Sequence, residues 1–188
     1  MISGTPGVGK TYVATRLASR LGLKYLNLSE LVVSEALYTD KDEARDTYVV
    51  DEERLIERVR TMLGSLESDV VVDSHYGEII PDELVRIIFV LRLNPALLYR
   101  KLVERGWVKS KVLENVEAEL LGVCARNALE EHPESKVCEI DVSDRNLDEV
   151  VDEVVGILNG SRACHPAIDW LSQELPDDLL AELLKRES

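Results

Sequence analysis

The residues best suited to chemistry lie near the start of the chain, where positions 4–11 read GTPGVGKT. This stretch matches the phosphate-loop pattern G-x-x-x-x-G-K-[ST] at every fixed position. Glycines in such a loop let successive backbone N–H groups point into one concavity that binds an anion. The lysine reaches the β- and γ-phosphates of a nucleotide, and the final hydroxyl ligates its magnesium ion. We therefore predict a nucleotide site in which Lys10 contacts phosphate and Thr11 contacts Mg²⁺.

A second group of polar residues follows the valines at positions 70–72. The valines predict a buried strand that ends at Asp73, and ligands of parallel α/β sheets gather at the carboxyl ends of the strands. We therefore expect Asp73 on the same rim as the phosphate loop, where it holds magnesium through water. A lone histidine is more often structural than catalytic, but His75 lies only two residues beyond this carboxylate and is a candidate for the same site.

Five cations crowd into a short stretch of an otherwise acidic chain: Arg100, Lys101, Arg105, Lys109 and Lys111. Such a cluster either grips an anion or consists of the ordinary solvated charges of a helix hairpin. We favour phosphate contact for Arg105, because a guanidinium group can bind two oxygens at once.

The elements that must position these residues alternate between strand and helix. Positions 11–21 place apolar residues on one helical face before Gly22, a typical helix end, which argues against a phosphate loop that is only a connecting turn. The alternation predicts a parallel sheet covered on both faces. The expected strands are 24–28, 70–73, 87–93 and 136–142. Three helices are expected at 52–66, 108–131 and 147–159. Another is expected to begin at the cap Ser29, and a further one to run from Asn94-Pro95 to Glu104.

Three stretches carry weaker patterns. Positions 38–51 are polar and show no apolar period, so they are either a functional loop or a solvated connector. Only three residues precede the phosphate loop, so either the first strand is very short or the natural chain begins upstream of Met1. After a linker at 161–166, the tail from 167 to 186 predicts two short amphipathic helices split by Pro176, packed on the core or on a partner.

The totals describe a chain of ordinary composition. Its 188 residues, 45% apolar and 31% charged, fit one domain. The apolar run at 87–91 is far too short to span a membrane, and no leader precedes the phosphate loop, so we expect a cytoplasmic protein. Cys124, Cys138 and Cys164 have no metal-ligand or redox spacing, which predicts three unpaired thiols in a reducing compartment.

The net charge of −14 restricts the partners of the protein. An acidic surface repels nucleic-acid backbones and anionic membranes, so we expect no direct contact with either. Such a surface favours a basic partner, although it also serves solubility alone.

Together these motifs resemble the adenylate kinase isoenzyme 6 family, a branch of the small nucleoside-monophosphate kinases found in archaea and eukaryotes, whose yeast member is a ribosome-assembly factor. The resemblance rests on the phosphate loop, on GLKYLN at 22–27, on Asp73-x-His75, and on VERGW at 103–107, which Asn115 and Glu119 follow. It extends from Met1 to about Gly160. The chain departs from the family pattern at Tyr12, where Thr is usual, and at Tyr76, which separates His75 from Gly77.

The resemblance implies an α/β fold of the P-loop nucleoside-monophosphate-kinase type, with a five-stranded parallel sheet flanked by helices and a short lid. It divides the chain into a core at 1–160 and a helical C-terminal tail at 161–188. Within the core, it implies a monophosphate-binding region at about 27–50 and a lid at about 104–114.

The resemblance also assigns roles to residues. Asp73 and His75 would serve the magnesium and the attacked phosphate, with Lys10 and Arg105 as further catalytic residues. The nucleotide-binding candidates are Gly7, Gly9, Lys10, Thr11, Tyr12, Arg105 and Arg145, and the metal candidates are Thr11 and Asp73.

The implied activity is transfer of the γ-phosphate of ATP to AMP, with ATP and Mg²⁺ as cofactors, AMP and ADP as substrates, and slow ATP hydrolysis beside it. The family also implies a role in small ribosomal subunit maturation through a basic small-subunit ribosomal protein. Two alternatives stay open: an assembly ATPase with little kinase role, and a kinase for another small metabolite such as shikimate.

Overall fold

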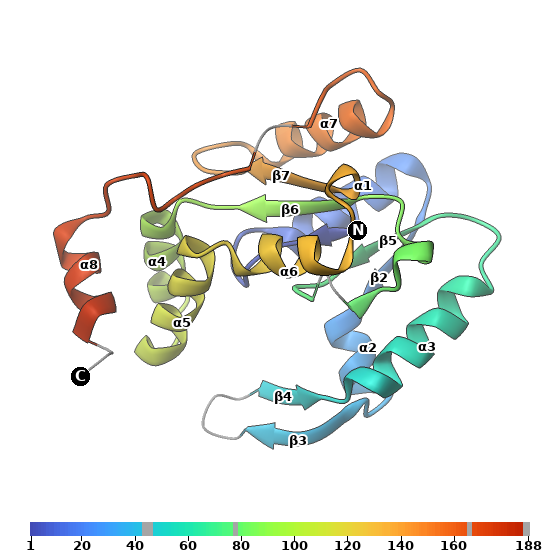
Figure 1. Cartoon of the computed structure of the whole chain (residues 1–188), viewed down its shortest axis with the longest axis horizontal. Coiled ribbons are helices and arrows are strands. Elements are labelled where there is room, and N and C mark those ends of the chain that lie inside the picture. Colours follow the sequence, from blue (N-terminus) through green and yellow to red (C-terminus); the bar gives the residue numbers. More distant parts are fainter. Residues whose placement is uncertain (43–46, 77–78, 165–166, 186–188) are drawn as a thin grey trace.

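A five-stranded parallel sheet in the order β2-β5-β1-β6-β7 forms the centre of the molecule (Figure 1). The computed structural model describes residues 1–42, 47–76, 79–164 and 167–185. Every residue of the strand β6 is buried, as expected where helices cover both faces of a parallel sheet. The sheet strands are β1 (Ile2–Ser3), β2 (Lys24–Asn27), β5 (Val70–Asp73), β6 (Ile88–Arg92) and β7 (Val137–Asp141).

Alternate side chains of the central strands enter two separate cores, because successive residues of a strand point to opposite faces. Phe89 and Leu91 of β6 lie in the core that α1 and α7 cover. Ile88 and Val90 lie in the core that α2, α3 and α6 cover. The helices are α1 (Lys10–Leu21), α2 (Leu28–Ser34), α3 (Glu52–Gly64), α4 (Pro95–Glu104), α5 (Lys109–Leu120), α6 (Val123–Glu131), α7 (Leu147–Leu158) and α8 (Asp177–Leu184), with 3₁₀ turns η2 (Asp82–Leu84) and η3 (Glu134–Lys136).

The expected sheet and most expected elements are confirmed, but two helix boundaries were wrong. The cap of α2 is Asn27 and not Ser29, because the Asn27 side chain accepts hydrogen bonds from the backbone N–H groups of Ser29 and Glu30. The single helix expected over 108–131 is two helices, α5 and α6. The chain turns between them at Gly122, whose φ of 62° lies in the left-handed region that glycine adopts easily.

The polar segment 38–51 contains a β-hairpin rather than a loop. Strands β3 (Tyr38–Asp42) and β4 (Thr47–Val50) pair antiparallel, and the rings of Tyr38 and Tyr48 lie 4.5 Å apart. Most of the hairpin side chains are at least partly exposed, so the sequence lacks the apolar alternation of a half-buried strand. Residues 43–46 lie outside the described residues, as does Gly77.

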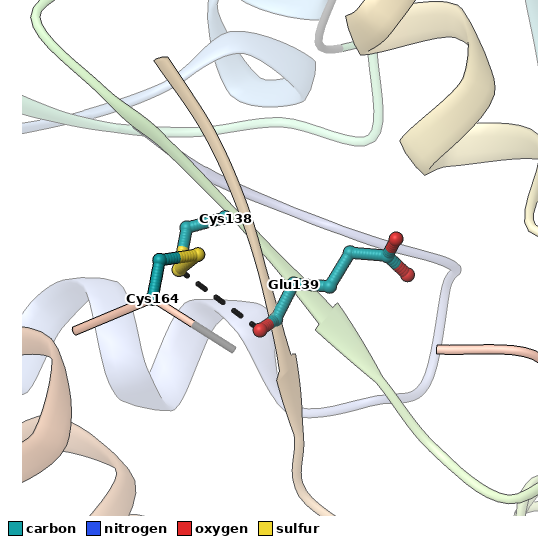
Figure 2. The surroundings of a disulfide bond; sticks show 3 residues. All are labelled: Cys138, Glu139 and Cys164. Atoms are coloured by element: carbon teal, nitrogen blue, oxygen red, sulfur yellow. Dashed lines mark hydrogen bonds between the residues drawn. A yellow bond between two sulfur atoms is a disulfide. The ribbon is translucent and has the colours of Figure 1, made fainter. Parts of the chain in front are cut away.

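The prediction of three unpaired thiols was wrong. Cys138 of β7 and Cys164 form a disulfide bond, with their Cα atoms 5.7 Å apart (Figure 2). The two cysteines are 26 residues apart in the chain, and only the return of the chain past α7 to β7 brings them together. Spacing along the sequence therefore carries no signal of this pair, while Cys124 stays outside the disulfide.

The tail also differs from its prediction, because it contains one helix instead of two. Of its described residues, only Asp177–Leu184 form a helix, and this helix, α8, lies beside α4 and α5 (Figure 1). The apolar residues before Pro176 do not form a helix, and Trp170 is instead inserted into the core with 3% of its surface exposed. The expected linker at 161–166 has no helix or strand in its described part, and its residues 165–166 lie outside that part.

Nothing in the described part of the chain forms a helix of the length and apolarity needed to cross a bilayer.

Candidate active site

The phosphate loop joins β1 to α1 at the carboxyl edge of the sheet, where two of its glycines leave no room for side chains. Gly7 has a φ of 100°, and a Cβ atom there would lie 2.8 Å from Cδ2 of Leu102. Gly9 has a φ of 115°, and its Cβ atom would lie 3.0 Å from Cδ1 of Leu147. The loop is therefore held closely between α4 and the start of α7, and only glycine fits at both positions.

Lys10 turns back over the loop. Its Nζ donates a hydrogen bond to the backbone oxygen of Thr5 at 3.1 Å. Burial lowers the pKa of Lys10, and the nearby charges of Asp73 and Glu119 oppose this shift. A partly desolvated ammonium group inside a curled loop is well placed to attract an anion.

Thr11 and Asp73 meet at the same edge. The Thr11 hydroxyl donates a hydrogen bond of 2.7 Å to Oδ2 of Asp73, whose side chain ends the buried strand β5. Tyr25 donates to the same oxygen at 3.0 Å, and the side-chain amide of Asn27 donates to the Tyr25 hydroxyl at 3.3 Å. The predicted meeting of Thr11 and Asp73 is therefore present in the structure.

A hydroxyl and a carboxylate are the oxygen ligands that Mg²⁺ prefers, and the ion keeps several waters beside them. Among the described residues, no group of three or more His, Cys, Asp or Glu side chains forms a metal cage. A pair such as Thr11 and Asp73 fits magnesium held partly by nucleotide phosphates better than it fits a metal held by protein alone.

His75 lies in the same part of the structure. Burial, with a contribution from the positive charge of Lys10, lowers the pKa of His75 to about 4. The imidazole is therefore neutral at pH 7, and its ring lies 3.8 Å from the ring of Tyr76. The backbone oxygen of His75 accepts a hydrogen bond from the Cys124 thiol at 3.7 Å, which ties this segment to α6.

Arg105 lies apart from these contacts, at the end of α4. It is exposed, and its side chain has no hydrogen bond or ion pair with the described part of the chain. Burial and then the charge of Arg105 lower the pKa of Lys101. The two cations therefore lie close enough to each other for their charges to interact.

Arg145 and Tyr12 have other partners. The Arg145 guanidinium donates to the backbone oxygen of Asp141 at 2.9 Å and to Oε2 of Glu153 at 2.5 Å. Tyr12 is 43% exposed, with the Arg16 guanidinium 6.0 Å from its ring centre. The structure therefore brings Lys10, Thr11, Asp73 and His75 to one region, and it does not join Arg105, Arg145 or Tyr12 to them by a hydrogen bond.

Sequence reasoning missed Tyr25 and Trp170 as members of the site region. Tyr25 reaches Asp73 because β2 pairs with β5, with Asn27 opposite Asp73 in the register, and that pairing leaves no trace in the sequence. Trp170 donates its indole N–H to Glu119 from the tail, 51 residues away. The sequence indicates Glu119 only through the family resemblance.

A cavity of about 640 Å³ opens at the opposite edge of the sheet, against the amino ends of β5 and β6. Its lining includes Leu17, Val70 and Ile87, and none of the residues predicted for the nucleotide site. The candidate active site is therefore defined by the polar contacts at the carboxyl edge and not by this cavity.

The sequence of the chain is similar to those of known proteins. Residues 1–122 match a family model described as an AAA domain. A protein of Saccharolobus solfataricus named "Putative adenylate kinase" is 36% identical over 185 residues, which cover 98% of this chain and 94% of the relative. Proteins of the same name from Methanocaldococcus jannaschii and Pyrococcus furiosus are each 37% identical over 170 residues, and the match covers 90% of this chain in both cases and 90% and 89% of the relatives.

Solved structures share the fold at lower identity. A shikimate kinase from Acinetobacter baumannii superposes with a TM-score of 0.57 at 15% identity, covering 86% of this chain and 92% of the other. A thymidylate kinase from Candida albicans gives a TM-score of 0.53 at 15% identity, covering 85% and 90%. These likenesses confirm the predicted P-loop kinase fold. The identity to the full-length relatives confirms the expected kinship, and the chain belongs to the P-loop kinase family of the proteins named "Putative adenylate kinase".

Proposed function

We propose that the protein transfers the γ-phosphate of ATP to AMP. The observation that carries this proposal is the 2.7 Å contact between Thr11 and Asp73 beside Lys10, since a magnesium site and a lysine at a phosphate loop are the parts that phosphoryl transfer requires. The choice of AMP as acceptor rests on the names of the full-length relatives.

In the proposed reaction, the protein mainly positions charge. The backbone of the loop around Gly7 and Gly9 cradles the phosphates, and Lys10 binds their oxygens. Thr11 and Asp73 would hold Mg²⁺, and the bound ion would offset negative charge on the phosphate oxygens. Tyr25 keeps its proton, because burial and the charge of Asp73 raise its pKa although Asn27 opposes this, and it holds the carboxylate in place.

His75 acts as a neutral group in this proposal. A protonated imidazole would add positive charge to the site, but the lowered pKa keeps the ring uncharged at pH 7. A neutral ring both donates and accepts hydrogen bonds, so it orients the attacked phosphate group or a water molecule. Water in place of AMP would give the slow ATP hydrolysis expected of the family.

Two segments complete the site. We assign AMP to the region 27–50, which contains α2 and the β3–β4 hairpin, and we assign the lid to residues 104–114. The exposed side chain of Arg105 then swings onto the phosphates when the lid closes over ATP. We also assign Arg145, which precedes α7, and Tyr12, in the first turn of α1, to the nucleotide.

The test is ADP formation from ATP and Mg²⁺ with AMP, CMP, GMP, UMP, shikimate or gluconate as the acceptor. We expect AMP to give the highest kcat/KM, with Lys10→Ala at least about 100-fold slower and still folded by circular dichroism. Preference for shikimate or gluconate would replace adenylate kinase with a metabolite kinase. ATP hydrolysis that no acceptor accelerates would leave an ATPase.

The charge of the protein supports a further role as an assembly factor in the cytoplasm. A net charge of −14 speeds association with a basic partner, and we propose a basic small-subunit ribosomal protein as that partner. The disulfide between the buried Cys138 and the exposed Cys164 is compatible with an intracellular location, since some intracellular proteins carry such bonds. Titration against these ribosomal proteins at low and high salt, with and without ATP, tests the role. Absence of binding at low salt would leave a nucleotide kinase alone.

A further inference from the structure

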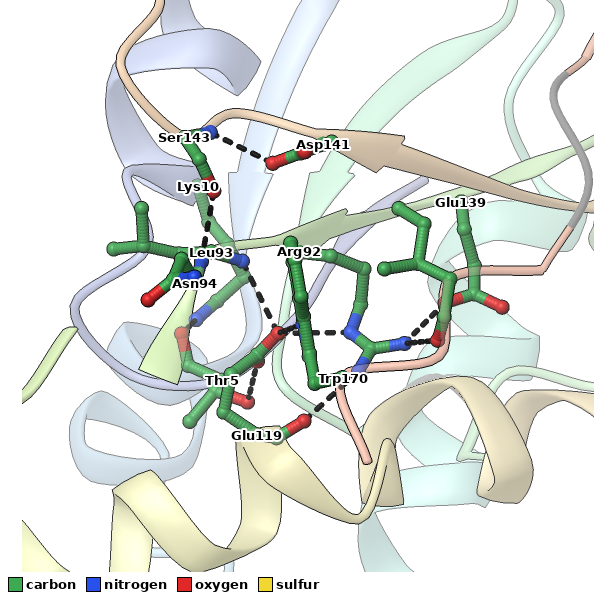
Figure 3. Close-up of polar contacts among 11 residues, drawn as sticks. Thr5, Lys10, Arg92, Leu93, Asn94, Glu119, Glu139, Asp141, Ser143 and Trp170 are labelled. Carbon is green, nitrogen blue, oxygen red and sulfur yellow. Dashed lines mark hydrogen bonds and ion pairs between the residues drawn. The ribbon is translucent and has the colours of Figure 1, made fainter. Parts of the chain in front are cut away.

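A cluster of buried charges lies directly behind the phosphate loop (Figure 3). Arg92, Glu119 and Glu139 are 2%, 1% and 7% exposed. Nε of Arg92 donates to Oε1 of Glu119 at 2.8 Å, and Nη1 of Arg92 donates to Oε2 of Glu139. Burial works against the charge of Arg92, but the two carboxylates outweigh it and raise the pKa of the guanidinium. One cation therefore faces two carboxylates, and the cluster needs neutral donors as well.

Glu119 receives those neutral donors from three parts of the chain. Oε1 accepts the backbone N–H of Leu93 at 3.1 Å and the indole N–H of Trp170 at 3.1 Å, in addition to Arg92. Oε2 accepts the hydroxyl of Thr5 at 2.5 Å. Thr5 belongs to the phosphate loop and Trp170 to the tail, so one carboxylate joins the loop to the tail.

Thr5 is hydrogen-bonded to both Glu119 and Lys10. The hydroxyl of Thr5 is held by Glu119, and its backbone oxygen accepts the ammonium group of Lys10 at 3.1 Å. A shift of Glu119 would therefore move the residue that holds Lys10, although neither Glu119 nor Trp170 has a hydrogen bond to Lys10 itself in the described structure.

The tail is well anchored around Trp170. On one side the disulfide of Cys164 fastens it to β7, and on the other Glu182 accepts hydrogen bonds from Tyr99 and Lys109 of α4 and α5. Next to the tryptophan, the backbone oxygen of Ile168 accepts Nη1 of Arg92 at 3.3 Å. The tail thus holds Trp170 against the charged cluster.

We infer that Trp170 is a positioning residue for the phosphate loop, acting through Glu119 and Thr5. This inference rests on the proposed function in that it takes ATP as the ligand of the loop. An indole N–H fixes the orientation of the Glu119 carboxylate, and the carboxylate in turn fixes Thr5 and the loop around Lys10. Through Trp170, the tail therefore helps to position the loop that binds the nucleotide, although it follows the catalytic core in sequence.

The experiment measures ATP binding by calorimetry at a temperature well below unfolding, together with the melting temperature of each variant. Trp170→Phe keeps an aromatic ring and removes the N–H group, and we expect it to weaken ATP binding roughly three- to tenfold. Leu179→Ala is the matched control, because Leu179 is a buried tail residue that has no bond to Glu119. We expect it to lower the melting temperature while ATP binding stays at the wild-type value.

A double-mutant cycle with Thr5→Val tests the route of the effect. If Trp170 acts through Glu119 and Thr5, the double variant binds ATP about as weakly as Thr5→Val alone, because the connection is already broken. Should Trp170→Phe not yield folded protein, Trp170→Leu, which also lacks the indole N–H group, takes its place in the same cycle.

The outcomes separate the two proposals. Wild-type protein that fails to bind ATP would remove the proposed function. Wild-type binding together with unchanged affinity in Trp170→Phe, equal losses in Trp170→Phe and Leu179→Ala, or full additivity with Thr5→Val would overturn the positioning role alone.

Discussion

Oδ2 of Asp73 accepts two hydroxyl hydrogen bonds, from Thr11 and from Tyr25. If Thr11 and Asp73 hold Mg²⁺ as proposed, both groups would turn to the ion and give up the hydrogen bond between them, while Tyr25 could keep its bond to the carboxylate. Outer partners of this kind orient metal ligands and tune affinity for the metal. Tyr25 therefore orients the carboxylate of Asp73, a role that the sequence alone did not indicate.

We predict that Tyr25→Phe raises the Mg²⁺ concentration needed for half-maximal activity about tenfold. The change removes one oxygen atom and keeps the ring, so the protein should remain folded. Magnesium titrations of ADP formation measure the effect. Tyr99→Phe is the matched control, because Tyr99 also donates its hydroxyl to a carboxylate, that of Glu182 in the tail. An equal magnesium dependence in wild type and Tyr25→Phe would contradict the prediction.

Arg105 lies at the end of α4, within the proposed lid. We expect Arg105→Lys to lower kcat about tenfold or more, because an ammonium group cannot bind two phosphate oxygens in the planar fork of a guanidinium group. Steady-state kinetics at saturating ATP and AMP give the measurement. Arg86→Lys serves as a control because Arg86 is an exposed arginine that pairs with Asp69, another exposed residue. An Arg105→Lys enzyme with unchanged kcat would identify Arg105 as a surface charge.

Helix α8 provides a prediction about pH. Hydrogen bonds from Lys109 and Tyr99 lower the pKa of Glu182 below its ordinary value of 4.5. A carboxylate whose pKa is lowered by folding stabilises the folded form above the unfolded pKa, and this contribution disappears as pH falls through the folded pKa. We therefore expect wild type to melt at a higher temperature than Glu182→Gln at pH 7 and the difference to shrink as the pH falls below 4.5 through the lowered pKa of Glu182. A difference that stays constant with pH would exclude the ion pair as its cause.

The disulfide between Cys138 and Cys164 closes a long loop of the chain that contains α7. The bond joins residues 26 positions apart, and restriction of the unfolded chain over such a loop is worth about 3 kcal/mol. We predict that Cys164→Ser lowers the free energy of unfolding by about this amount in urea titrations. Cys124→Ser removes a thiol that is outside the disulfide and should change stability less. Equal stability of wild type and Cys164→Ser would contradict the prediction.

The fold class and the contact between Thr11 and Asp73 could both be predicted from the amino-acid sequence. A phosphate loop is a local pattern, because its glycines, its lysine and the following helix are contiguous in the chain. The strand that ends at Asp73 was also readable, since a buried parallel strand is a continuous apolar run and its carboxyl end faces the ligand side of the sheet. These local rules suffice to bring Thr11 and Asp73 to one edge of the sheet.

The groups from distant parts of the chain that lie around the candidate active site could be identified only from the tertiary structure. Tyr25 reaches Asp73 because two strands far apart in sequence are paired, and Trp170 reaches Glu119 because the tail folds back over the core. The disulfide of Cys138 has the same origin, and the hairpin of 38–50 was hidden because its exposed faces carry no apolar alternation. Local patterns record propensity and burial, whereas long-range contacts depend on how whole elements pack, which no short stretch of sequence specifies.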